Sequence, residues 1–247
     1  MSEIIVKHLQ LDRKEESIPD VVIEAIRKAL ETDELKPGDR LPSEMEIAES
    51  MSISRGSVRE AMKILSAYGV VSVQRGKGTF ISENTDSKGF VNPTLFNFLL
   101  LKPEQKEIVD YRYFIERSVF EMAIKNATKE DIELLEKNLD AMKKLFNQTS
   151  NKSVELEIEF HRLLGKCTKN RLLEKTYQIA MEYFFPTIER THYNKDRLEE
   201  TIEIHKISIN TIKERSYEDI EKVLEMNTEI WIRLSRRVSE NKSSLFN

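Results

Sequence analysis

The uneven distribution of glycine and proline constrains the fold of this 247-residue chain most strongly. Ten of the thirteen glycines and prolines lie before residue 94. Because these residues mark turns and helix ends, the first third must change direction often, whereas the rest can continue as helix. A chain of this length accommodates one large domain or two ordinary ones, and the change in composition near residue 94 favours two. We therefore expect domains at residues 1–82 and 104–240, joined by a linker and connecting helix at 83–103.

Three short helices are predicted in the first domain. Residues 18–32 carry their apolar side chains on one stripe, which is typical of an amphipathic helix. Ser43 stands three residues before Glu46, the spacing of a capping box that begins a second helix. A third helix is expected to begin near Ser54 and to end at Gly69.

A hairpin is predicted directly after these helices. The segments VVSVQ (70–74) and TFIS (79–82) flank the glycine-rich turn RGKG, as strands flank a hairpin loop. Three helices followed by a hairpin describe a winged helix-turn-helix. From residue 93 onward, apolar stripes alternate with short polar breaks. The expected fold is therefore mainly α, a winged helix-turn-helix followed by an antiparallel bundle of six or seven helices.

Charge is concentrated locally although the net charge is only −4. Residues 1–85 contain 12 basic and 15 acidic side chains, yet residues 54–78 contain five basic and one acidic. Phosphate contacts are made by a patch of positive charge and do not depend on the average over the chain. Any surface that binds nucleic acid is therefore expected within this window.

The third predicted helix has the features of a DNA-reading helix. Ser54 lies at its start, where free backbone N–H groups favour an anion. Arg55 and Arg59 are four residues apart and share one face, which points away from the apolar stripe. An α-helix fits the major groove, and arginine can bond guanine O6 and N7 together. Isolated surface arginines are usually no more than solvated charges, so the argument depends on the helices and hairpin around them.

The turn of the hairpin combines cations with glycines. Arg75 and Lys77 flank Gly76, and Gly78 follows. Glycine lets the backbone approach phosphate or enter the minor groove closely. We expect Arg75, Gly76 and Lys77 to contact DNA as a wing.

Several features favour a cytoplasmic protein. No segment approaches 18 uninterrupted apolar residues, so we expect no membrane partner. The first residues lack the apolar core of a secretory signal. The lone Cys167 has no second cysteine for an internal disulfide, as is usual in a reducing compartment.

The segment KPGDRLPSEMEIAESMSISRGSVREAMKILSAYGVVSVQRGKGTFIS resembles the DNA-binding domain of the GntR family of bacterial regulators. This resemblance covers residues 17–82. It implies operator contacts by Ser54, Arg55 and Arg59, with Arg40 and Ser43 near phosphates and Gly76 at the wing tip. The family usually has a basic residue where this chain has Met45, whose thioether cannot make a charged contact.

Residues 105–235 resemble the all-helical FCD-type effector domain of the family's FadR-like branch, through DYRYFIERSVFEMA, ELEIEFHRLLGKCTKN and EIHKISINTI. Many such domains hold a divalent metal. The matching positions are Glu157, His161, His205 and Asn227, which implies one ion of the zinc, nickel or manganese class. Glu157 and His161 share a helix face. Asn227 stands where the family pattern has a third histidine, and its amide oxygen is a weaker, neutral ligand.

The effector site leaves alternatives open. His161 and His205 are either ligands or ordinary hydrogen-bonded histidines of a bundle. Arg112 is either the partner of an effector carboxylate or the partner of Glu116 one helical turn away. We expect the effector-binding residues to be Arg112, His161, His205 and Asn227.

Three functions follow from these patterns. The first is a non-enzymatic transcriptional regulator, expected to be a repressor, that binds a palindromic operator as a homodimer and senses a small organic acid. The second is a DNA-binding dimer whose effector site has decayed. The third is an all-α metallohydrolase built on Glu157, His161 and His205. The third lacks a recognisable nucleophile, base or oxyanion device and has no use for a DNA-reading head; no catalytic residue is expected.

Overall fold

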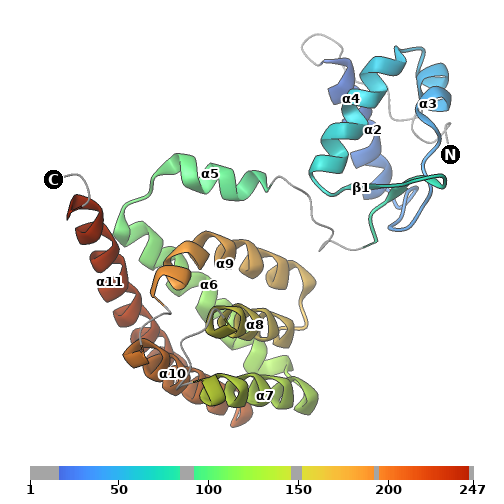
Figure 1. The fold of residues 1–247 in the computed structure, drawn as a ribbon. Coiled ribbons are helices and arrows are strands. Elements are labelled where there is room, and N and C mark those ends of the chain that lie inside the picture. Colours follow the sequence, from blue (N-terminus) through green and yellow to red (C-terminus); the bar gives the residue numbers. More distant parts are fainter. Residues whose placement is uncertain (1–16, 84–91, 146–151, 192–194, 245–247) are drawn as a thin grey trace. The chain divides into compact units, whose positions relative to one another are not determined.

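The computed structural model describes residues 17–83, 92–145, 152–191 and 195–244, with side chains described for 17–83, 92–145, 152–185 and 198–233. The chain divides into two compact units, residues 1–93 and 94–247. Figure 1 shows a first unit of short helices with a small hairpin and a second unit of longer helices.

The first unit packs three helices around one core. These are α2 (Ile18–Glu31), α3 (Glu44–Met51) and α4 (Arg55–Ala67). Both α2 and α3 pack against α4. The stripes predicted from the sequence supply the buried side chains, among them Val22 and Ile26 of α2 and Val58 and Leu65 of α4.

The helix ends follow local chemistry. Ser43 and Glu46 form the predicted capping box, in which each side chain bonds the backbone N–H of the other residue. The left-handed conformation of Ser52, with φ of 55°, ends α3. Gly69, with φ of 73°, follows α4, and the Val70 N–H then donates to the Leu65 carbonyl at 2.9 Å. This bond closes the end of the helix as glycine commonly does.

The wing consists of strands β1 (Val71–Gln74) and β2 (Gly78–Ile81). They pair antiparallel, with Val71 opposite Ile81 and Gln74 opposite Gly78. The segment before α3 lies on the other edge of β2, where the Leu41 N–H donates to the Thr79 carbonyl at 2.8 Å. The predicted winged helix-turn-helix is confirmed.

The described residues of the second unit form helices joined by short turns, with no strand. It contains α5 (Pro93–Leu101), α6 (Gln105–Asn126), α7 (Lys129–Leu145), α8 (Lys152–Cys167), α9 (Arg171–Thr191), α10 (Lys195–Lys213) and α11 (Ile220–Ser244). The helix α6 packs against α8, α9, α10 and α11. Buried aromatic side chains from α6, α8 and α9 meet in its core, including Phe120, Phe160 and Phe184. The predicted bundle of six or seven helices is confirmed.

The helix α5 joins the second unit through an aromatic contact. The Phe98 ring meets the Tyr111 and Tyr183 rings edge to face, at centroid distances of 5.5 and 5.7 Å. Across the described residues, no helix has the length and apolar character needed to cross a membrane.

Candidate DNA-binding surface and ligand site

The N-terminal turn of α4 presents polar and basic side chains to solvent. Ser54 caps the helix, since its Oγ accepts from the Ser57 N–H at 3.0 Å. Arg55 and Arg59 are both exposed, while Val58 and Leu65 on an adjoining face are buried. The helix therefore presents the two arginines together.

Arg59 is oriented by the neighbouring helix. Its Nε donates to Oε2 of Glu44, the first residue of α3, at 3.1 Å. The side chains are 54% and 38% exposed, respectively, so the pair lies at the surface and contributes little to stability. The pair places the Arg59 guanidinium between α3 and α4, the two helices of the motif.

The turn of the wing exposes its cations on a backbone that needs glycine. Arg75, Gly76 and Lys77 are all exposed. Gly76 has φ of 74° and Gly78 has φ of 117°. A Cβ on Gly78 would also lie 3.0 Å from Nε of Arg40. Arg40 therefore rests against the base of the wing.

A surface groove lies where the start of α3, the start of α4 and the wing meet. Arg40, Ser43, Met45, Arg55 and Thr79 are among the residues that line it. The Ser43 hydroxyl accepts the Glu46 N–H at 3.2 Å, and it can still donate its own hydrogen to a phosphate. Met45 is 48% exposed and lines this groove together with the apolar residues Leu41 and Pro42.

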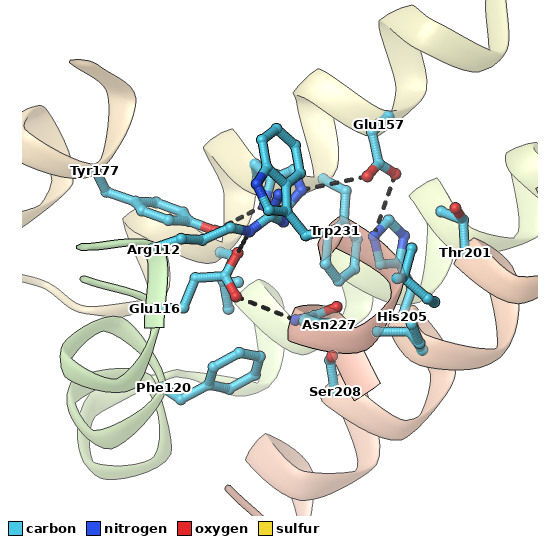
Figure 2. Close-up of a pocket in the computed structure, with 15 residues that line it drawn as sticks. Arg112, Glu116, Phe120, Glu157, Tyr177, Thr201, His205, Ser208, Asn227 and Trp231 are labelled. Carbon is cyan, nitrogen blue, oxygen red and sulfur yellow. Dashed lines mark hydrogen bonds and ion pairs between the residues drawn. The ribbon is translucent and has the colours of Figure 1, made fainter. Parts of the chain in front are cut away.

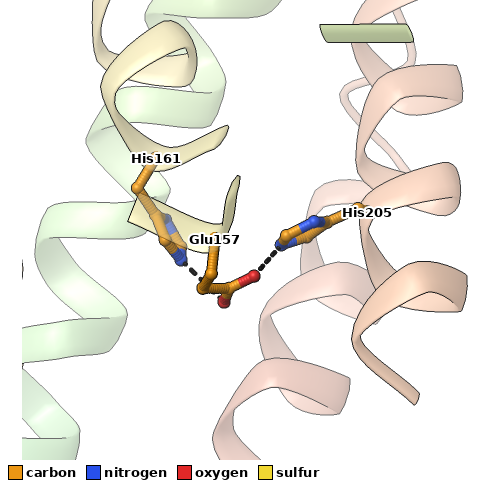
Figure 3. Close-up of side chains that lie close together, drawn as sticks. All are labelled: Glu157, His161 and His205. Atoms are coloured by element: carbon orange, nitrogen blue, oxygen red, sulfur yellow. Dashed lines mark hydrogen bonds and ion pairs between the residues drawn. The ribbon is translucent and has the colours of Figure 1, made fainter. Parts of the chain in front are cut away.

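In the second unit, a carboxylate bridges two histidines (Figure 3). Glu157 and His161 lie one turn apart on α8, and His205 lies on α10. Glu157 Oε1 is 3.3 Å from His161 Nε2, and Glu157 Oε2 is 3.2 Å from His205 Nε2. All three residues are buried. Glu157 and His161 therefore pair within α8 as predicted, and His205 of α10 meets the same carboxylate.

Neighbouring rings hold the two imidazoles in place. His161 Nδ1 lies 2.7 Å from the Tyr177 hydroxyl on α9. Burial raises the pKa of Tyr177 well above its ordinary value, and the carboxylate of Glu116 adds to this effect. The neutral hydroxyl can donate to Nδ1 or accept from it, so it suits either tautomer of His161. The His205 ring stacks on Phe160, with centroids 3.5 Å apart and an angle of 7°.

A second buried network borders the cluster (Figure 2). Arg112 Nε donates to Glu116 Oε1 at 2.8 Å, and Asn227 Nδ2 donates to Glu116 Oε2 at 3.3 Å. The guanidinium carbon of Arg112 lies 4.6 Å from the ring centroid of Trp231 and 5.3 Å from that of Phe184. Arg112 thus makes the predicted pairing with Glu116, and it also lines the cavity.

Both networks line one small cavity. The enclosed space is about 20 Å³, which holds one water molecule or one ion but not an organic acid. Two buried polar atoms of its lining, Thr201 Oγ1 and Trp231 Nε1, have no hydrogen-bond partner among the described residues. An organic ligand would therefore need side chains of the lining to move, and two unsatisfied groups would be available to it.

The residues present fit a divalent metal ion. The ligand atoms of Glu157, His161 and His205 all lie within 4.8 Å of one another. A carboxylate with two imidazoles is a donor set that zinc, nickel and manganese accept. Such an ion would supply a positive charge able to attract a carboxylate ligand. Asn227 lines the same cavity, with its amide nitrogen directed to Glu116.

Sequence reasoning missed several residues of this site. Tyr177, Phe160 and Trp231 hold the two histidines and Arg112, and Glu44 orients Arg59. Phe160 adjoins His161 in the sequence, and this position directly before a candidate ligand is the one signal that was available. The other contacts join different helices and leave no local pattern.

Fold and surfaces define a winged-helix DNA-binding protein with a helical second domain. The chain belongs to the gntR family of bacterial regulatory proteins, whose family model matches residues 19–81. The FCD domain model matches residues 107–228. The chain is thus a transcriptional regulator with an FCD domain and not an enzyme, and the metallohydrolase alternative is not favoured.

Known relatives are similar over most of the chain. The "HTH-type transcriptional regulator LutR" of Bacillus subtilis (strain 168) is 29% identical over 77% of this chain and 81% of its own length. The "HTH-type transcriptional repressor NanR" of Klebsiella aerogenes is 24% identical over 92% of this chain and 88% of its own length.

A solved structure shares the fold. "Streptococcus agalactiae GntR" superposes with a TM-score of 0.62 and 24% identity, covering 88% of this chain and 98% of that one. The likeness extends over both units and supports the architecture described above.

Proposed function

We propose that this chain binds a specific duplex DNA site as a homodimer, and that a small organic acid bound in the helical domain controls this binding. Residues 1–82 would read DNA, residues 104–240 would bind the effector and dimerise, and residues 83–103 would connect them. The observation that carries the DNA-binding part is the exposed pair Arg55 and Arg59 at the start of α4.

Arg55 and Arg59 are the base-reading residues in this proposal. Their exposed face can enter the major groove, where arginine recognises guanine through two bonds. Ser54 would meet a phosphate at the helix N-terminus. Arg40 and Ser43 line the adjacent groove and would contact the backbone, as would Arg75, Gly76 and Lys77 from the wing. Backbone contacts position the protein, whereas base contacts give specificity.

Dimerisation follows from the small size of one reading helix. A single helix contacts too few base pairs to select one site in a genome, so two copies would read two half-sites. A palindromic operator matches the two-fold symmetry of a homodimer. Repression is the outcome we propose, supported by the relative that is named a transcriptional repressor.

The helical domain would hold one divalent metal through Glu157, His161 and His205. The metal would attract the carboxylate of an organic acid, while the unsatisfied groups of Thr201 and Trp231 bond its other oxygens. Because the cavity is about 20 Å³, ligand entry must rearrange its lining. A rearrangement of the bundle is the means by which the effector would shift the population of dimer geometries that fit the operator.

The DNA-binding part is tested with an operator selected from random-sequence duplexes and measured by fluorescence anisotropy. Arg55→Ala and Arg59→Ala should each abolish specific binding while size-exclusion chromatography shows an intact dimer. Lys125→Ala removes an exposed cation of the second unit and should bind like wild type. Wild-type operator affinity in both arginine variants would contradict the proposal.

The effector part is tested by a thermal-shift screen of small carboxylates with and without a chelator. Stabilisation that disappears with chelator indicates recognition through the metal, and stabilisation that persists indicates direct recognition at Arg112. A panel that changes neither thermal stability nor operator affinity would instead support the DNA-binding dimer without an effector.

A further inference from the structure

Met45 is an exposed apolar side chain in the groove that is proposed to face DNA. It is 48% exposed, whereas Leu41 of the same lining is 3% exposed and belongs to the core of the first unit. Single exposed apolar side chains are common on protein surfaces, so exposure alone does not indicate a function. The residues around Met45 are what make its position informative.

The carboxylates on either side of Met45 are tied to other partners. Glu44 Oε2 accepts from Arg59 Nε at 3.1 Å, and Glu46 Oε2 accepts from the Ser43 N–H at 2.8 Å. A thioether is at most a weak hydrogen-bond acceptor, so no comparable bond fixes Met45. Its unbranched side chain, with three rotatable bonds, can extend and adapt to a surface that it meets.

Met45 shares its groove with Arg55, although ten residues separate them in the sequence. Met45 is the second residue of α3, and Arg55 is the first residue of α4. In helix-turn-helix proteins, residues at the N-terminus of the second helix reach the base edges in the major groove. Met45 therefore lies on the surface that would face the same stretch of major groove as Arg55.

The chemistry of the thioether leaves one partner on this stretch of DNA. Phosphate contacts need a cation or a hydrogen-bond donor, and methionine supplies neither. Base edges in the major groove present hydrogen-bond donors and acceptors, and they present one apolar group, the C5-methyl of thymine.

We propose that Met45 contacts the C5-methyl group of a thymine next to the base pair that Arg55 reads, and thereby selects T·A at that position of each half-site. This inference rests on the DNA-binding part of the proposed function and deepens it. It makes Met45 a residue that determines operator preference by apolar contact, beside an arginine that acts by hydrogen bonding.

The competing explanation is that Met45 occupies the groove without touching a base. Its loss could then change operator affinity, but the change would not depend on any methyl group of the DNA. Deoxyuridine separates the two explanations, because it lacks the C5-methyl of thymidine and keeps the same hydrogen-bonding groups on its base edge.

The experiment uses the full-length chain and the operator selected from random-sequence duplexes. Each thymine position of the half-sites is replaced in turn by deoxyuridine, and binding is measured by fluorescence anisotropy at constant salt. At one position, the replacement should weaken wild-type binding about fourfold for each half-site and about fifteenfold for both, the cost of leaving one methyl group per half-site unburied. At this position, 5-methylcytosine should bind more tightly than cytosine by a similar factor, because it restores the methyl group.

Variants at Met45 assign this discrimination to its side chain. Met45→Ala and Met45→Gln should bind the thymine and uracil operators with affinities within about twofold of each other. Glutamine matches methionine in helix propensity but ends in a polar amide. Met45→Leu keeps an apolar side chain and should still prefer thymine.

Ile18→Ala is the matched control. Ile18 is 47% exposed, close to the value for Met45, but it lies at the start of α2 and does not line the groove. This variant should distinguish thymine from uracil as wild type does. Circular dichroism verifies the folding of every variant.

Three results would overturn the inference: a selected half-site with no thymine next to a guanine, no thymine whose replacement by uracil weakens wild-type binding, or a Met45→Ala variant that still distinguishes thymine from uracil. Loss of specific binding in Arg55→Ala would leave the proposed DNA-binding function intact in all three cases. If no operator can be selected at all, the DNA-binding part of the proposed function fails and the inference fails with it.

Discussion

Glu44 and Arg59 are fifteen residues apart in the sequence, and Glu44 Oε2 accepts from Arg59 Nε at 3.1 Å. This contact joins the first residue of α3 to the exposed face of α4. In the proposed DNA complex, this contact would align the Arg59 guanidinium before DNA binds and would place a negative charge near the phosphates.

Glu44→Gln should therefore change the affinity for the operator and the affinity for non-specific DNA in opposite directions. The loss of a negative charge should strengthen non-specific binding, which depends on phosphate contacts. The loss of alignment should weaken base reading by Arg59. We expect the ratio of operator to random-DNA affinity to fall about tenfold, measured by anisotropy at constant salt. An unchanged ratio would show that the Glu44 contact does not orient Arg59 for DNA.

Gly78 and Gly76 allow a matched test of the wing. Both have positive φ, but a Cβ on Gly78 would meet Arg40 Nε at 3.0 Å, whereas a Cβ on Gly76 meets nothing within 4 Å. Gly76→Ala should cost about 1 kcal/mol of unfolding free energy, and Gly78→Ala about 2–3 kcal/mol.

Thermal unfolding followed by circular dichroism should detect this loss of stability, because both glycines lie in the first unit. Fluorescence of the single tryptophan reports on the second unit and should not change. Because Gly78→Ala also displaces Arg40, it should weaken DNA binding more than Gly76→Ala does. Equal effects of the two substitutions would argue against the contact with Arg40.

Tyr177 predicts a dependence of stability on alkaline pH. Burial raises the pKa of its hydroxyl above the ordinary value of 10.0, so the folded state holds this proton more tightly than the unfolded state. The contribution of the protonated Tyr177 hydroxyl to the free energy of unfolding is largest below the pKa of the unfolded state. This contribution is lost as the pH rises above that pKa.

Tyr177→Phe removes both this dependence and the hydrogen bond to His161. The variant should be less stable by about 1 kcal/mol near neutral pH. The difference from wild type should narrow between about pH 9 and pH 11, around the unfolded pKa of tyrosine. Urea unfolding followed by Trp231 fluorescence measures both values, and a difference that grows with pH would contradict the buried, neutral hydroxyl.

Much of the fold could be predicted because its signals are local. The capping box of Ser43 and Glu46 and the glycine after α4 act within one helical turn. The apolar stripes of the bundle recur at helical spacing for the same reason. Each signal follows from backbone hydrogen bonding or burial over a few residues, so it can be read without knowledge of the tertiary structure.

The site could be predicted only where its residues share a helix or match the family pattern. The i,i+4 spacing predicted both Glu157 with His161 and Arg112 with Glu116. The bond from Asn227 to Glu116 spans 111 residues, and no local pattern records it. The size of the cavity also depends on how side chains from several helices pack, which the sequence does not express in any single segment.

The most direct test of control by the helical domain is the affinity of the full-length chain for Mn²⁺, measured with and without saturating operator DNA. If the two sites are coupled, DNA must change the metal affinity by the same factor as metal changes DNA affinity. We predict a change of about 5-fold or more. In His205→Ala, which should lose metal binding, added Mn²⁺ should leave the operator affinity unchanged. Identical metal affinities with and without operator would contradict the account.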